Sequence, residues 1–152
     1  MRLHLLGLPH TITCEASSHC AFTAKILKFC QMMKPFGYHI IHYGVEGAQT
    51  DAAEHVEIMT VEDQLRLEPR LNHSDPTKFV GETANSTTPL YQEFNLRLRE
   101  ALRRRMQPED LVLLPFGHGH AQAVDGMGWR CVESGIGYAN LYAGAQCKIF
   151  ES

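Results

Sequence analysis

The sequence lacks the short motifs that mark the commonest nucleotide-binding and hydrolytic sites. It has no G-x-x-x-x-G-K-[ST] phosphate loop, and the turn after its first predicted strand has no G-x-G-x-x-G fingerprint. No G-x-S-x-G segment supports a serine nucleophile. The function therefore has to be sought in less specific clusters of polar residues.

Cysteine pairs, excess positive charge and long apolar runs are also missing. The net charge of −3 argues against a general nucleic-acid binder. No apolar run approaches the length of a membrane span, and the run after Met1 breaks at Gly7, which is too short for a signal peptide. We therefore expect a cytoplasmic protein without a membrane span. The five cysteines are odd in number, include no C-x-x-C pair and favour free thiols over a zinc site or a disulfide framework: Cys14, Cys20, Cys30, Cys131 and Cys147.

Short apolar runs alternating with amphipathic helical patterns predict one α/β domain over residues 1–152. The opening strand, helix and strand have the pattern of a right-handed parallel crossover. We expect a Rossmann-like domain with a mostly parallel sheet flanked by helices. Strands are predicted near residues 2–6, 38–43, 56–59, 111–114, 129–132 and 148–150, and long helices near 18–34 and 89–106.

Residues at the predicted helix ends support this assignment. Ser17 or Ser18 is expected to cap the first long helix, and Thr88 with Pro89 to begin the second. Thr60 begins a predicted brief helix that ends near Leu67, and a short helix is expected from about residue 121. The segment 69–88 between them has no clear period and is predicted to be a long loop.

Polar residues gather where three of the predicted strands end. His10 follows the first strand, His118 and His120 follow the fourth, and Glu133 ends the fifth. Ligands in an open α/β sheet bind beyond the carboxyl ends of the strands, so we expect His10, His120 and Glu133 to line one pocket. The neighbouring glycines are expected to have positive φ or to allow close approach to a ligand: Gly117, Gly119, Gly135 and Gly137.

Each candidate side chain has a functional and a structural interpretation. His10 is a candidate general base or acceptor ligand, or a loop histidine bonded to backbone. His120 is expected to be a neutral hydrogen-bond donor, whereas His118 is expected to be more structural. Glu133 is a sugar-hydroxyl partner, a base or a cap of backbone N–H groups, and Tyr138 stacks on a sugar or packs. Two histidines one residue apart make a weak metal signal, and no metal is expected.

The order of these segments resembles that of a known enzyme group. Gly117-His118-Gly119-His120, the segment 132–138, the opening 7–11, the segment 91–95 and the closing 150–152 look like bacterial and phage glycosyltransferases of the two-domain GT-B type. The resemblance spans nearly the whole chain. From the strand-end positions, and not from the resemblance, we expect His10 and Glu133 to be catalytic residues. The residues expected to bind substrate are His118, His120, Gly117, Gly119, Gly135, Gly137 and Tyr138.

The resemblance also implies partners and a missing part. The family has two facing Rossmann-like domains, of which the first holds the acceptor and the second binds a nucleotide-sugar donor. This chain resembles only the first, so the expected donor domain is absent and the chain alone need not be an active enzyme. We expect a small-molecule or glycan acceptor, no tightly bound cofactor, and self-association or a donor-domain partner chain. The alternatives are a non-catalytic ligand- or nucleotide-binding module and one half of a split enzyme.

Overall fold

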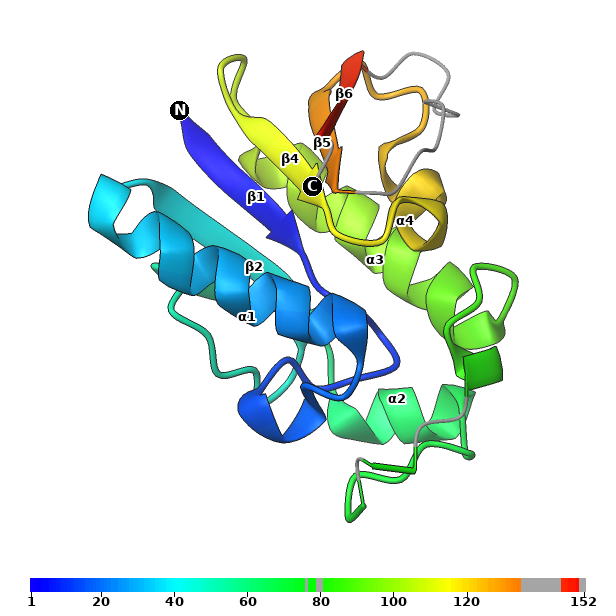
Figure 1. Ribbon diagram of the computed structural model, residues 1–152. Coiled ribbons are helices and arrows are strands. Elements are labelled where there is room, and N and C mark those ends of the chain that lie inside the picture. Colours follow the sequence, from blue (N-terminus) through cyan, green and yellow to red (C-terminus); the bar gives the residue numbers. More distant parts are fainter. Residues whose placement is uncertain (76, 79–80, 135–145, 151–152) are drawn as a thin grey trace.

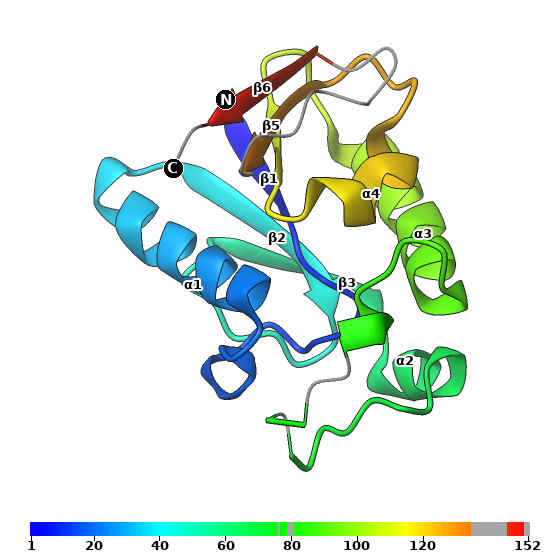
Figure 2. The same ribbon diagram turned by 45° about the vertical axis from the view of Figure 1, so that its right-hand side comes forward.

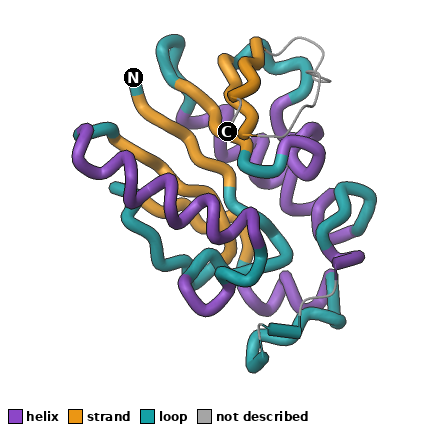
Figure 3. The backbone as a smooth tube through the Cα atoms, viewed as in Figure 1, coloured by secondary structure: helices purple, strands orange, loops and turns teal. Residues whose placement is uncertain are grey.

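The structure is a computed structural model that describes residues 1–75, 77–78, 81–134 and 146–150. In that part of the chain a parallel sheet is flanked by helices on both faces (Figures 1 and 3). The predicted α/β, Rossmann-like class is confirmed. None of the described helices has the length and apolar character needed to cross a membrane.

The described part of the sheet has six strands in the order β3-β2-β1-β4-β5-β6, and each pairs in parallel with its neighbours. This is the order of a doubly wound nucleotide-binding sheet. The strand predictions are confirmed, with ends shifted by no more than two residues. The strands are β1 (Arg2–Leu6), β2 (His39–Val45), β3 (Glu54–Met59), β4 (Leu111–Leu114), β5 (Arg130–Ser134) and β6 (Gln146–Phe150).

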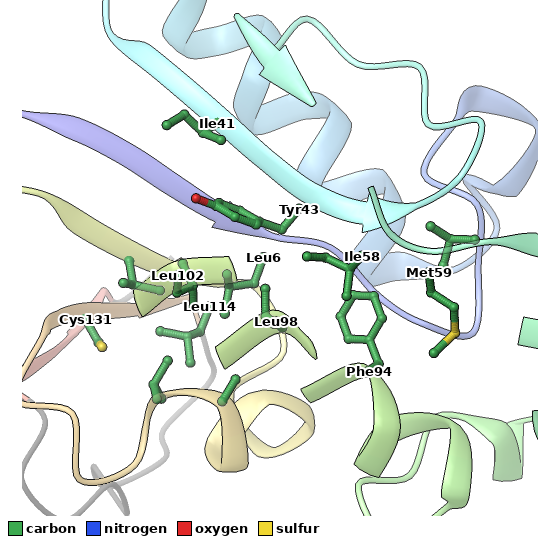
Figure 4. Packing of buried hydrophobic residues seen from close by; sticks show 14 of the residues in the cluster. Leu6, Ile41, Tyr43, Ile58, Met59, Phe94, Leu98, Leu102, Leu114 and Cys131 are labelled. Atoms are coloured by element: carbon green, nitrogen blue, oxygen red, sulfur yellow. The ribbon is translucent and has the colours of Figure 1, made fainter. Parts of the chain in front are cut away.

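Alternation along the strands divides the core into two layers. One face packs Leu3, Leu5 and Ile40 against α1 (Ala21–Met33). The opposite face packs residues such as Leu6 and Tyr43 against α3 (Pro89–Arg105) and α4 (Gly117–Val124) (Figure 4). Because successive strand residues point to opposite faces, continuous apolar strands fill both layers.

Most of the predicted helix starts are confirmed. The Thr60 hydroxyl accepts a hydrogen bond from the Asp63 N–H at the start of α2 (Val61–Leu67), and Thr88 accepts from the Tyr91 N–H at the start of α3. Pro89 occupies the first turn of α3, as predicted. The segment 69–88 is largely a loop, with one described 3₁₀ turn, Gly81–Thr83.

Two predictions about helix starts are wrong. Neither Ser17 nor Ser18 caps α1: Ser17 belongs to a 3₁₀ turn (Glu15–Ser17), and the residue at the N-cap of α1 is Cys20. The helix α4 begins at Gly117 rather than near residue 121. Burial of this helix against α3 outweighs the low helix propensity of its two glycines.

Asp110, the residue just before β4, has a buried carboxylate that is hydrogen-bonded to residues of β1. Asp110 is 1% exposed and accepts hydrogen bonds from the Arg2 guanidinium (2.7 Å) and the Arg2 backbone N–H (2.9 Å). The His4 Nε2 lies 3.0 Å from the same carboxylate, and the His4 Nδ1 lies 2.7 Å from the Tyr43 hydroxyl. Burial alone raises the pKa of Asp110, but the hydrogen bonds from Arg2 and His4 outweigh it and hold that pKa well below its usual value.

We predict that Asp110→Asn lowers the free energy of unfolding by about 3 kcal/mol, because it removes the charged partner of a largely buried ion pair. For a domain of this size the thermal midpoint should fall by roughly 6–12 °C. The matched control is Asp51→Asn, which breaks a 2.9 Å pair with Lys34 in which both side chains are exposed. It should change stability by less than about 1 kcal/mol. Equal effects of the two substitutions in urea denaturation would contradict the assignment.

Candidate functional site

The chain turns to opposite faces of the sheet after two adjacent strands. β1 lies between β2 and β4, and the chain leaves β1 toward α1 on one face and β4 toward α4 on the other (Figure 2). Open α/β sheets bind their ligands beyond the carboxyl ends of the strands at such a point. Residues 7–20 and 115–120 are the segments at this point, so His10 and His120 both belong to it.

His120 is fully buried, and its surroundings define its tautomer. The Asn95 side-chain N–H donates to the Gly119 carbonyl oxygen (2.7 Å), so the amide oxygen of Asn95 faces the His120 Nδ1 (3.4 Å). Nδ1 therefore carries the hydrogen, and the His120 Nε2 is an acceptor. This atom is buried without a hydrogen-bond partner among the described residues. Sequence analysis predicted a donor, but the ring's N–H is already directed at Asn95.

His10 is also buried, and both of its ring nitrogens have neighbours. Its Nδ1 lies 2.7 Å from the Tyr91 hydroxyl, and its Nε2 lies 3.4 Å from the Cys20 sulfur. Burial lowers the pKa of His10 to about 4. Burial, followed by the effect of His10, lowers the pKa of His120 to about 3. The two imidazoles are thus electrostatic neighbours, and both are neutral near pH 7.

Aromatic rings separate the two histidines from the sheet face covered by α1. Phe116, at the N-cap of α4, packs on Phe22 of α1 with ring centroids 4.5 Å apart and meets the Tyr91 ring edge-on at 6.2 Å. A Cβ atom added to Gly119 would collide with the Phe116 ring and lie 2.8 Å from the Tyr91 ring. Gly119 is therefore explained by close packing against aromatic side chains, and not by positive φ.

Glu133 is associated with a different histidine. It is 4% exposed and lies beside Leu114, the last residue of β4. Burial raises the pKa of Glu133, and His118 opposes that rise, so these two side chains are near enough to interact. His118 is exposed, whereas His10 and His120 are buried.

The described structure brings His10 and His120 together, and Glu133 toward His118. The groups that shift the pKa of His120 and of Glu133 differ: His10 acts on His120, and His118 acts on Glu133. Gly117 is buried and lacks positive φ, so the expectation of positive φ is wrong for both glycines of α4. Gly135, Gly137 and Tyr138 lie outside the described residues.

Sequence analysis missed the residues that hold the two histidines in place. Tyr91 and Asn95 are four residues apart, so they lie on one side of α3, and both are fully buried. A tyrosine and an asparagine on the buried stripe of a helix are the signal that could have found them, because buried polar groups require partners. Cys20 had been interpreted only as a free thiol.

A metal ion has no obvious place in this arrangement. Among the described residues, no group of three or more histidine, cysteine or acidic side chains is arranged to hold one. The residues of this region include a buried neutral acceptor, the His120 Nε2, and a carboxyl group of raised pKa, that of Glu133, which lies toward His118.

Comparison with known proteins adds no assignment, since no protein-family model and no curated protein sequence matches this chain.

We predict that His10 and His120 stay neutral in the folded protein down to about pH 4. Their folded pKa values, about 4 and about 3, lie below the ordinary value of 6.5, so the unfolded chain takes up protons first as the pH falls. Their contribution to stability is fully present above about pH 6.5 and is lost progressively as the pH falls toward 4. NMR of ¹³C-histidine-labelled protein should show neither resonance titrating above pH 5, whereas both titrate near 6.5 in urea. Titration of either one between pH 5.5 and 7.5 in the folded protein would contradict the prediction.

Proposed function

We propose that this chain is the acceptor-side portion of a glycosyltransferase that uses a nucleotide-sugar donor. The observation that carries the proposal is the His120 Nε2, which is buried at the switch point of the sheet and has no hydrogen-bond partner among the residues that the structure describes. A buried acceptor without a donor costs about 1–3 kcal/mol, so such atoms are normally satisfied by water or a ligand. A sugar or glycan acceptor supplies hydroxyl groups, which donate the hydrogen bond that this nitrogen lacks.

The two histidines have different roles in this proposal. His120, with its pKa lowered to about 3, is too weak a base to take the proton of an alcohol, which is far less acidic than a thiol, so it orients an acceptor hydroxyl. His10 has Tyr91 and Cys20 at its ring nitrogens and can act on a ligand only when one of them moves away. Its first role in this proposal is structural, through its contacts with Tyr91 and Cys20.

Glu133 is the candidate general base. Burial raises its pKa, which brings its proton affinity closer to neutral pH than that of an ordinary carboxylate. Removal of the proton from the acceptor hydroxyl would let its oxygen attack the anomeric carbon of the donor sugar. The bond from that carbon to the diphosphate then breaks, and the nucleoside diphosphate leaves.

In this proposal a partner domain of Rossmann-like fold holds the donor. An apolar groove of about 280 Å³ on the face covered by α1 offers a surface for such a partner. Burial of apolar surface is the main favourable term in association. The groove is lined by Leu5, Lys25, Phe29, Leu113, Leu114, Pro115 and Val132.

A binding module without catalysis is the second candidate. It is favoured by the weak basicity of His120, since a neutral acceptor binds a hydroxyl without any proton transfer. The two candidates share the same ligand chemistry and differ in whether the nucleoside diphosphate is released.

Saturation-transfer NMR with methyl glycosides, UDP-glucose and GDP-mannose tests the shared site. We predict that at least one of these sugars binds. His120→Phe should weaken that binding about tenfold, because about 1.4 kcal/mol of hydrogen bonding is lost while a planar aromatic ring still fills the position. Glu133→Gln should weaken binding less and abolish any release of UDP or GDP. Release by the wild-type chain, alone or with a donor-domain protein, distinguishes the enzyme from the binding module.

The matched control is His39→Gln. His39 is exposed and begins β2, at the amino ends of the strands and away from the proposed site. It should leave sugar binding unchanged. Melting curves accompany every variant. A fall of several degrees in the thermal midpoint of His120→Phe, with sugar binding intact, would make His120 structural and overturn the proposal.

A further inference from the structure

Cys20 has a base beside it, the imidazole of His10. Its sulfur lies 3.4 Å from the Nε2 of His10, and the residue occupies the N-cap of α1, a helix of 13 residues. Imidazole groups and helix N-termini both favour negative charge on a cysteine sulfur. The first favours loss of the thiol proton, and the second favours the anion that remains.

A third group orients the base. The Nδ1 of His10 lies 2.7 Å from the Tyr91 hydroxyl, and the two rings are stacked with centroids 5.9 Å apart. When the Cys20 thiol donates to Nε2, the hydrogen of the imidazole resides on Nδ1 and is donated to the Tyr91 oxygen. A nucleophile, a base and a group that orients the base within hydrogen-bonding reach form the arrangement found in activated nucleophiles.

Cys14 and Cys30 differ from Cys20 in their neighbours. Cys14 is half-buried, and its sulfur is 3.8 Å from the Ser17 hydroxyl. Cys30 is fully buried, and burial raises the pKa of its thiol to about 11. These two cysteines therefore serve as internal controls for the reactivity of Cys20.

We propose that Cys20 is a peroxide-reactive thiol, with His10 as its base and Tyr91 as the group that positions His10. The thiol proton passes to Nε2 of His10, and the sulfur attacks one oxygen of hydrogen peroxide. The O–O bond breaks, the sulfur keeps the attacked oxygen as sulfenic acid, and the leaving hydroxide takes the proton from His10 to become water. The sulfur loses two electrons and the peroxide gains them, so no other reactant is needed.

Burial restricts the class of reactant. Cys20 is 7% exposed and is enclosed by His10 and the first turn of α1, which excludes bulky disulfides and favours hydrogen peroxide. This inference does not depend on the proposed glycosyl transfer. A protein that binds no sugar would still oxidise at Cys20.

The test is site-resolved oxidation by hydrogen peroxide. The protein is exposed to limited peroxide, the peroxide is destroyed with catalase, and the chain is unfolded in dimedone to trap every sulfenic acid. Mass spectrometry of the peptides gives a rate for each cysteine. We predict that Cys20 oxidises at least tenfold faster than the more exposed Cys14.

Two variants test whether His10 and Tyr91, and not the exposure of the sulfur, determine the oxidation rate of Cys20. His10→Gln should slow oxidation of Cys20 about tenfold, and Tyr91→Phe should slow it severalfold while leaving the Cys14 rate unchanged. Circular dichroism checks that each variant is folded, and Tyr91→Phe retains the ring if His10→Gln does not fold. The proposal is overturned if Cys14 oxidises as fast as Cys20 in the wild-type protein, or if folded Tyr91→Phe oxidises at the wild-type rate.

Discussion

The pairing of β1 with two neighbours determines where everything else lies. This five-residue strand pairs with β2 on one side and β4 on the other. The crossovers from β1 to β2 and from β4 to β5 run in opposite directions along the sheet, so with the same right-handed sense they cover opposite faces. Parallel pairing places the carboxyl ends of these strands at one edge, where residues from three distant segments meet. The ion pair between Arg2 and Asp110 lies at the opposite, amino ends of the strands, where it connects the start of β1 to the residue before β4.

Buried histidines are the unusual feature of this interior. His4, His10, His42 and His120 are all at most 3% exposed, and burial lowers the pKa of each. Each is neutral near pH 7, but their surroundings differ. His4 lies between a carboxylate and a phenol, and His42 shares a 3.0 Å contact with His55 across β2 and β3. A neutral imidazole, with one donor and one acceptor, fits each of these surroundings.

Much of the fold could be predicted because its signals are local. Apolar runs gave the six strands, and Thr60, Thr88 and Pro89 act through the first turn of their own helices. The start of α4 could not be predicted in this way. Its glycines are poor helix formers in isolation, and their helical state depends on α3, which lies more than ten residues away in the sequence.

The candidate site was predictable in position but not in its contacts. The strand-end rule brought His10 and His120 to one edge, as the structure does. It could not give the partners, because Tyr91 and Asn95 come from the middle of the chain through α3. Nor could it assign Glu133 to His118, since that depends on the direction in which each side chain leaves its strand or helix.

The amide of Asn95 has a consequence for how the site responds to its surroundings. A histidine on a protein surface gains or loses its positive charge near neutral pH, so ligand binding at a surface histidine depends on pH. Here the Gly119 carbonyl orients Asn95, Asn95 orients His120, and burial keeps the ring from taking up a second proton. The His120 Nε2 thus remains a neutral acceptor over the pH range in which a surface histidine titrates, as the amide oxygen of a glutamine would. Whatever occupies this position meets the same surface in an acid-stressed cell as in a resting one.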